Sequence, residues 1–443
     1  MTGNAKALSP KATLMVGATL FSMFFGAGNL ILPPLLGVQA GTATLPATIG
    51  FFITGVGLPV LGIVAVALAG TVRELADRVH PVFSRVFVAA VYLAIGPCLA
   101  IPRTSSTAFE MLAPLLPAGI SVEVARLVFS VAFFALSFAL AMHPGRLTRL
   151  LGRVTGPALI LLIVGVVVPS LVSLATGQVQ AAPAPVAPYD TNAAVQGFLT
   201  GYQTMDLLAS LTFGLVIATN IRNLGVTDTG GVMREVCRAG VIAGVLMMAI
   251  YGGLAVVGFD LSAALAGATN GAEVITASAT MHYGTLGTAV VAAIFLLACL
   301  NVCTGLISCC GTYFAEELPR VPYRVWAIGF AAFSCVISNF GLDAILAFSV
   351  PLLNALYPVA IVLVIGGMAH RVLDAYPLTW PVTVGLVGVS SVVVSLRDAF
   401  APGAWVIFDA LPFADMGLGW VLLAVVGIVL GVCLSALGKM RRR

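Results

Sequence analysis

Apolar runs long enough to cross a lipid bilayer fill most of this 443-residue chain. A transmembrane helix needs about 20 apolar residues, whereas a strand of a membrane barrel needs about 10 residues of alternating polarity. The runs here are continuous and far longer than such a strand, so they predict helices. Only 9% of the residues are charged, against about 25% in ordinary soluble domains. The sequence therefore predicts an all-α polytopic membrane protein and excludes a soluble enzyme, a disordered chain and a nucleic-acid-binding protein.

Charged or turn-rich segments divide the apolar runs into twelve predicted transmembrane helices. The longest polar break is the Ala- and Pro-rich stretch 177–192, and shorter breaks contain charged residues, as in 73–81 and 316–320. The predicted spans cover residues 12–37, 43–70, 84–113, 122–142, 150–174, 196–221, 236–259, 285–314, 323–341, 343–369, 379–396 and 415–437.

Basic residues predict the orientation of the spans. If the N-terminus is cytoplasmic, all of the 21 Lys and Arg residues except Arg103, Arg126 and Arg397 fall at inward-facing loops or ends. Cytoplasmic loops carry an excess of Lys and Arg, so this distribution predicts an even number of spans with both termini in the cytoplasm. The net charge of +4 is then a topological signal, and contact of the basic C-terminal tail with anionic membrane lipids is a lesser alternative.

Residue types that catalyse reactions or bind resident metals are scattered. Nearly all of the eight cysteines lie inside apolar runs, where a thiol behaves as a small hydrophobe. The sequence has no CxxC pair, and its four histidines fall in predicted loops without forming a cluster. We therefore expect neither an enzyme nor a bound cofactor.

The span order predicts an inverted repeat. Spans 1–5 occupy residues 12–174 and spans 6–10 occupy residues 196–369, while two further spans fill residues 379–437. An odd number of spans in each block inverts the second block relative to the first. Transporters with this architecture carry discontinuous helices at corresponding positions. Spans 1 and 6 meet that expectation, because polar and glycine residues interrupt both near their middle.

These interruptions supply candidate substrate-binding groups. A half-helix that begins near Gly28 would direct free N–H groups at a carboxylate, and carbonyls around Ser22 and Phe25 would suit a metal cation or an ammonium group. The alternative is that Gly26 and Gly28 only pack against another helix. The candidate substrate-binding residues of the two breaks are Phe25, Gly26, Ala27, Gly28, Asn29, Gly201, Tyr202, Gln203, Thr204 and Asp206.

Three segments carry a family resemblance: FSMFFGAGNLILPPLLGVQAG, IGPCLAIPRTSSTAFE and GFLTGYQTMDLLASLTFG. They closely resemble the bacterial branched-chain amino acid:cation symporters, the BrnQ-type carriers, over essentially the whole chain. That family resembles the LeuT-like transporters, whose fold is an inverted repeat of five helices plus five. The resemblance implies import of leucine, isoleucine and valine with Na⁺, or alternatively with H⁺, across the bacterial inner membrane. It also implies that N–H groups of Ala27 and Gly28 receive the substrate carboxylate, and that carbonyls at Ser22 and Phe25 face the sodium ion.

The eighth span departs from the family pattern. Members of the family tend to read CLTT-x-x-GL there, with hydroxyls that complete the ion site, whereas this chain reads CLNVCTGL at 299–306. Val302 has no oxygen to offer a sodium ion. Asn301, Thr304 and Ser308 share one helix face and are predicted to supply substitute oxygens.

Three ionisable residues lie inside predicted spans, where each is costly and therefore a functional candidate. Asp206 would carry a proton, attract the substrate ammonium or tune the ion site; alternatively it caps the second half of span 6. Arg103 lies 18 residues beyond Arg85, about 27 Å of helical rise, which predicts a position near the outer edge of the membrane core. There it would form an outer gate with Glu110 or Asp206, or it would be a structural arginine that snorkels to the surface.

The predicted mechanism is alternating access, in which spans 1, 2, 6 and 7 rock against the others around a midplane site. The remaining alternatives are a carrier for another small amino acid or organic solute, and a channel. The sequence leaves the oligomeric state open.

Overall fold

The computed structural model describes residues 8–117, 119–142, 160–161, 163–177, 181–401 and 404–440. All regular elements within these ranges are helical. The helices of the first half are α1 (Pro10–Phe24), α2 (Ala27–Ala40), α3 (Thr44–Phe52), α4 (Leu58–Ala69), α5 (Val72–Asp77), α6 (Pro81–Leu93), α7 (Ala100–Leu112) and α8 (Val122–Ala141), followed by a helix over Ile163–Ala175. Those of the second half are α10 (Ala193–Thr200), α11 (Asp206–Asn223), α12 (Thr229–Asp260), α13 (Gly271–Glu317), α14 (Tyr323–Ser338), α15 (Leu342–Met368), α16 (His370–Leu373), α17 (Thr379–Phe400) and α18 (Trp420–Met440).

The helices are long and apolar enough for a multi-pass membrane protein. Within the described ranges, eight helical segments can cross a membrane by length and composition, or nine when the bent pair α10–α11 is counted. Large apolar side chains such as Leu127 and Val128 on α8, and Val425 and Val429 on α18, are exposed on the outside. The count of twelve spans stays a prediction, and residues 150–159 of the predicted fifth span lie outside the described residues.

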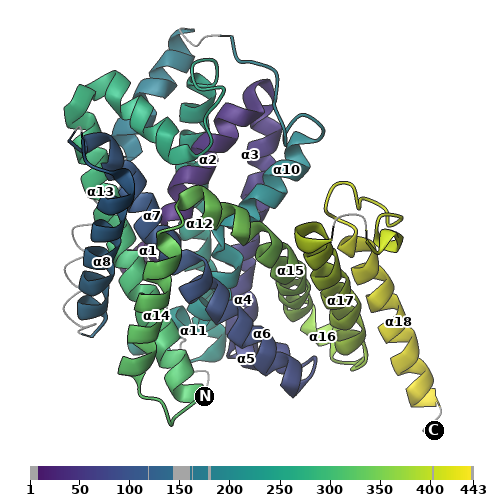
Figure 1. Ribbon diagram of the computed structural model, residues 1–443. Helices are drawn as coiled ribbons and strands as arrows, with labels where there is room; N and C mark the ends of the chain where they lie inside the picture. The colour runs from purple at the N-terminus through teal and green to yellow at the C-terminus, as the bar shows by residue number, and fades with distance from the viewer. Residues whose placement is uncertain are drawn as a thin grey trace.

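Two groups of helices, each with its own apolar core, adjoin the interruption of span 1, and a third core joins α4, α5 and α6 to α11, α15 and α17. The helices of predicted spans 1, 2, 6 and 7, namely α1 to α4 and α10 to α12, pack on one another around a shared apolar core. In the second group, α7, α8, α13 and α14 pack around another core. Helix α2 contacts both α7 and α13, so the interruption just before α2 lies at the boundary between the two groups. Figure 1 shows α17 and α18 at one side of the molecule, with both chain ends at the same end of the helices.

Within the described ranges, four predicted spans are interrupted rather than continuous. Span 1 is non-helical at Phe25 and Gly26, between α1 and α2, as the sequence predicts. Span 6 contains a 3₁₀ turn, η5 (Gly201–Thr204), and bends by 48° between α10 and α11. The sequence analysis did not predict the other two, which are π-helical segments in span 2, η2 (Ile53–Gly57), and span 3, η3 (Ala94–Cys98). Such π segments are rare and are frequent at functional sites.

Helix α13 is longer than a bilayer requires because it joins two helices. Gly284 has φ 62° and ψ −157°, which is not helical and marks a kink inside the element. The part after Gly284 corresponds to the predicted eighth span at 285–314.

Candidate functional site

Arg103 contacts the interruptions of both span 1 and span 6. It is the fourth residue of α7, shortly after the non-helical Gly96 of η3, and it is only 3% exposed. Its Nη1 donates to the carbonyl oxygen of Gln203, 2.6 Å away. A methyl group added at Gly28 would lie 2.7 Å from the guanidinium carbon of Arg103. The guanidinium therefore rests on the start of α2, and three interrupted spans meet around it.

This position of Arg103 differs from the predicted one. The rise of a straight helix placed it near the outer edge of the membrane, whereas the structure places it level with the two breaks that were predicted at the midplane. Span 3 is not a straight helix, because η3 and the kink at Gly96 change its direction before α7 begins. The snorkelling alternative is wrong, since the side chain is buried.

The structure does not bring Arg103 and Glu110 together. Glu110 Oε1 instead lies 3.8 Å from Nη2 of Arg126 on α8, and the Arg126 guanidinium lies over the ring of Phe109. Glu110 also lines an open cavity of about 710 Å³, together with Glu273 of α13. In the described part of the chain, no ion pair joins Arg103 to Asp206 either. A gate built on either pair therefore has no direct contact to support it.

Asp206 accepts hydrogen bonds in a buried network that connects the two breaks. Its Oδ2 accepts from Nδ2 of Asn29, 2.7 Å away, and from the hydroxyl of Tyr251, 3.0 Å away. The Asn29 amide also donates to the Tyr251 hydroxyl, and Asn29 Oδ1 accepts from the backbone N–H of Gly26 at 3.3 Å. None of the three side chains is more than 2% exposed. The network ties the start of α2 to the start of α11 and to the middle of α12.

The hydroxyl of Thr204, rather than the carboxylate of Asp206, accepts a backbone N–H at the start of α11, whose N-cap is Met205. The Thr204 hydroxyl accepts from the backbone N–H of Asp206 at 3.3 Å and donates to the carbonyl oxygen of Gly201 at 2.9 Å. Between them, Met205 has φ 63° and ψ 10°, a left-handed conformation that is uncommon for a residue other than glycine. Such strained residues cluster at functional sites. The Asp206 carboxylate does not cap α11 and accepts from Asn29 and Tyr251 instead.

Gly201 and Tyr202 contact neighbouring helices. A methyl group added at Gly201 would lie 2.9 Å from the Cβ atom of Thr54 in η2, so packing accounts for this glycine. Tyr202 stacks on Tyr357 of α15, with ring centroids 4.3 Å apart. It also lines a crevice of about 100 Å³ that Ser391 of α17 shares. These two residues support the shape of the break rather than the network around Asp206.

The candidate residues of span 1 lie at the break between α1 and α2 or within the adjoining turns. Phe25 is 3% exposed and stacks on Tyr251, with ring centroids 6.4 Å apart. Ala27 and Gly28 are the first two residues of α2, so their N–H groups have no carbonyl partner within the helix. Ser22 lies in the last turn of α1, where carbonyl groups are likewise left without helical partners.

On α13, the residue beside the break is Val302. Its Cγ1 would lie 3.7 Å from a methyl group added at Gly26. At about 100° per residue, Asn301, Thr304 and Ser308 lie about 100–160° around the helix from Val302. Accordingly, the Thr304 hydroxyl donates to the carbonyl of Leu300, 2.8 Å away. The substitute sodium ligands predicted from the sequence therefore face away from the break.

The sequence did not point to two residues near the network, Tyr251 and Tyr357, whereas Gln203 was among the predicted candidates. Tyr251 lies in the middle of span 7, and its hydroxyl in an otherwise apolar run was the available signal, because a buried hydroxyl needs a partner. The Tyr357 hydroxyl and Gln203 Oε1 are both buried and have no hydrogen-bond partner among the described residues. Nothing in the order of the residues indicated that Tyr357 of α15 would stack at the span 6 break.

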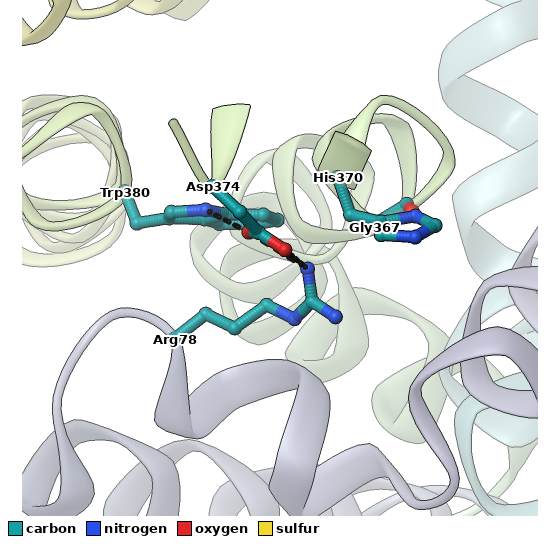
Figure 2. A network of polar contacts seen from close by, with 5 residues as sticks. All are labelled: Arg78, Gly367, His370, Asp374 and Trp380. Carbon is teal, nitrogen blue, oxygen red and sulfur yellow. Dashed lines mark hydrogen bonds and ion pairs between the residues drawn. The ribbon is translucent and has the colours of Figure 1, made fainter. Parts of the chain in front are cut away.

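A second polar cluster lies at the end of the molecule that was predicted to be cytoplasmic. Arg78, which ends α5, donates to both carboxylate oxygens of Asp374 at 2.9 and 2.8 Å (Figure 2). Trp380 Nε1 donates to the same carboxylate, and the guanidinium lies 5.6 Å from the centroid of its ring system. Arg73, also on α5, pairs with Glu317 at the end of α13 at 2.5 Å. These contacts hold the segment between spans 2 and 3 against the end of α13 and the segment between α16 and α17.

Comparison with known proteins gives one consistent family. Residues 9–437 match the family described as "Branched-chain amino acid transport protein". The chain is 36% identical to the branched-chain amino acid permease BraB of Bacillus subtilis, covering 97% of this chain and 96% of that one. It is 38% identical to the branched-chain amino acid transport system 2 carrier protein of Pseudomonas aeruginosa, covering 97% of each chain. It is also 34% identical to the Bacillus subtilis permease BrnQ, covering 97% of this chain and 98% of that one.

Solved structures share the fold at low sequence identity. The inward-facing conformation of Mhp1 aligns with a TM-score of 0.60 and 13% identity, covering 99% of this chain and 96% of that one. A closed conformation of the same transporter, described as a nucleobase-cation-symport-1 family member, gives 0.58 over 97% and 94% at 13% identity. A manganese transporter of Eremococcus coleocola gives 0.53 over 99% and 98% at 14% identity. These likenesses place the chain among LeuT-like transporter folds.

Proposed function

Because the chain belongs to the branched-chain amino acid transport protein family, we propose that it imports leucine, isoleucine and valine by symport with a cation. The observation that carries the proposal is the meeting of two broken helices at the 2.7 Å hydrogen bond between Asn29 and Asp206. Discontinuous helices of this kind hold the substrate in secondary transporters.

The groups at the breaks match the chemistry of an aliphatic amino acid. Free N–H groups at the start of α2 and its positive dipole end favour a carboxylate. Across the break, the Asp206 carboxylate and the unpartnered Gln203 Oε1 are acceptors that suit an ammonium group. The buried rings of Phe25 and Tyr251, together with Phe51, which packs edge-on to Tyr251, provide apolar surface nearby for a branched side chain.

The coupling cation has two candidates. The family resemblance favours Na⁺, with carbonyls at Ser22 and Phe25 as its ligands. Sodium requires hard oxygen donors, and the α13 residue next to the break is Val302, which has none. The second candidate is H⁺, which the valine supports. Asp206, a buried acid that accepts hydrogen bonds from Asn29 and Tyr251, would bind the coupled proton.

Transport would proceed by alternating access between the two groups of helices. The group that carries both breaks, α1 to α4 with α10 to α12, would rock against α7, α8, α13 and α14. The proposed inverted repeat relates residues 12–174 to residues 196–369, so that the two breaks occupy equivalent positions on opposite sides. In this proposal the protein lies in the bacterial inner membrane with both termini cytoplasmic, and the cation gradient supplies the free energy.

Substrate counterflow in proteoliposomes tests the substrate class. Vesicles loaded with unlabelled leucine take up radiolabelled leucine, and external isoleucine and valine are expected to compete at least tenfold better than alanine, lysine or glutamate. Equal competition by small or charged amino acids would favour a carrier for another solute, and an absence of counterflow would favour a channel. Repeating uptake with an inward gradient of Na⁺ alone or H⁺ alone identifies the coupling ion.

A further inference from the structure

The guanidinium of Arg103 is buried without an ion-pair partner among the residues that the structure describes. A guanidinium has five N–H donors, and the structure gives this one a single hydrogen bond, to the carbonyl oxygen of Gln203. Among the described residues no carboxylate lies within ion-pair distance of it, and Asp206 attracts it only from farther away. A buried charge is strongly disfavoured unless a partner and further hydrogen bonds compensate it. Its position therefore indicates a partner that arrives from outside the chain.

The surroundings of Arg103 specify where such a partner would bind. The guanidinium lies on Gly28, at the start of α2, where the first N–H groups of the helix are unpaired. An anion placed there would meet the guanidinium and the positive end of the α2 dipole together, and both would attract it. The glycine is needed for this arrangement, because any Cβ atom at position 28 would overlap the guanidinium.

We propose that Arg103 is a substrate-binding residue that holds the α-carboxylate of the amino acid against the start of α2. This inference rests on the proposed function, because the expected partner is the carboxylate of a transported amino acid. It extends the resemblance-based assignment, in which backbone N–H groups alone receive the carboxylate. Gln203 also contributes to this arrangement, since its backbone carbonyl oxygen accepts a hydrogen bond from Arg103.

The proposal predicts a specific selectivity. Charge-assisted, forked hydrogen bonds from arginine to a carboxylate are strong and geometrically demanding. Leucine should therefore bind much more tightly than leucinamide, which keeps the ammonium group and the isobutyl side chain but lacks the carboxylate. If Arg103 only balanced the charge of Asp206, Arg103→Lys, which keeps the positive charge, would leave the ratio of the two affinities unchanged.

The test is equilibrium binding of radiolabelled leucine to the purified full-length protein in nanodiscs, with competition by unlabelled leucinamide. In the wild-type protein, leucine is expected to bind at least about tenfold more tightly than leucinamide. Arg103→Gln keeps a donor for the Gln203 carbonyl and removes the charge. It should weaken leucine binding by about 10- to 100-fold without weakening leucinamide binding, so that the affinity ratio falls toward one.

Arg126→Gln is the matched control, because Arg126 pairs with Glu110 away from the breaks. It should leave the affinity ratio at the wild-type value. If Arg103→Gln does not fold, Arg103→Lys permits the same comparison, because lysine keeps a buried positive charge but has no planar fork, and the ratio should again fall severalfold. A variant of Arg103 that folds and keeps the wild-type ratio overturns the proposed role. Wild-type protein that binds no leucine would contradict the proposed function itself.

Discussion

Asn29 holds three partners that no other side chain of its size could hold together. Its Oδ1 accepts from the N–H of Gly26, while its Nδ2 donates to Asp206 and to the Tyr251 hydroxyl. An aspartate at this position could not donate, and an apolar residue would leave buried polar groups without partners. Inside a low-dielectric interior each of these bonds is stronger than in water, and each is costly to leave unmade. The break in span 1 is therefore fixed by chemistry supplied from spans 6 and 7.

Asp206→Asn is expected to abolish most transport while preserving the fold. The asparagine Oδ1 can still accept from Asn29 and Tyr251, so the buried shape is retained, but the negative charge that suits an ammonium group or a coupling proton is lost. We expect leucine uptake into proteoliposomes to fall at least about tenfold, since hydrogen bonds to charged groups are worth about 1.5–3 kcal/mol. Asp190→Asn, at an exposed loop position, is the control. Uptake by Asp206→Asn at the level of this control would contradict the assignment.

The interruptions of spans 2 and 6 depend on each other. The Thr54 hydroxyl in η2 donates to the carbonyl oxygen of Phe198 in α10 at 2.6 Å. Gly201, at the start of η5, approaches Thr54 so closely that a side chain would overlap it. The π-helical segment of span 2 thus donates a hydrogen bond to a backbone carbonyl near the end of α10 in span 6.

Gly201→Ala should destabilise the protein through this contact. The added methyl group would meet Thr54 Cβ at 2.9 Å, and overpacking of this kind costs about 1–3 kcal/mol. Gly385→Ala on α17 is the matched control, because nothing lies within 4 Å of its added methyl group and alanine favours helix by about 1 kcal/mol. Thermal unfolding in detergent should therefore show a lower midpoint for Gly201→Ala only. Equal midpoints would indicate that η5 and η2 are not tightly packed at Gly201 and Thr54.

The sequence allowed two of the four interruptions to be predicted, for identifiable reasons. Polar residues such as Asn29, Gln203 and Asp206 stand out inside apolar runs, so spans 1 and 6 were recognisable. Ile53–Gly57 contains little that is polar, and its π turn is set by the neighbouring α10. Gly96-Pro97 was readable as a helix breaker, but it lies within a run long enough to be treated as a single helix.

Across the whole molecule, contacts between helices determine which side chains reach the breaks, and the amino-acid composition does not reveal this. The apolar runs gave the order of the helices, and the basic residues gave an expected orientation. They carried no information on how each helix is rotated about its axis. That rotation turns Val302 toward the break and directs Asn301, Thr304 and Ser308 elsewhere. It also brings Arg103 to the start of α2, a contact between residues 75 positions apart that no periodic pattern records.

The predicted orientation can be tested with single added cysteines in intact bacterial cells. Asp190→Cys lies in an exposed segment before α10, and Arg320→Cys lies in the exposed loop between α13 and α14. With cytoplasmic termini, a membrane-impermeant maleimide should label position 190 from outside and position 320 only after permeabilisation. Wild-type protein gives the background from the eight native cysteines. Labelling of position 320 in intact cells would reverse the proposed topology.

The central claim is that the two breaks form the site of a cation-driven amino acid carrier. The most direct measurement is the ratio of internal to external radiolabelled leucine in proteoliposomes under an imposed Na⁺ or H⁺ gradient. One cation moving across 100 mV releases about 2.3 kcal/mol, enough for about fifty-fold accumulation. We predict a ratio well above one that collapses when an ionophore dissipates the gradient. A ratio that never exceeds one with either cation would contradict the account.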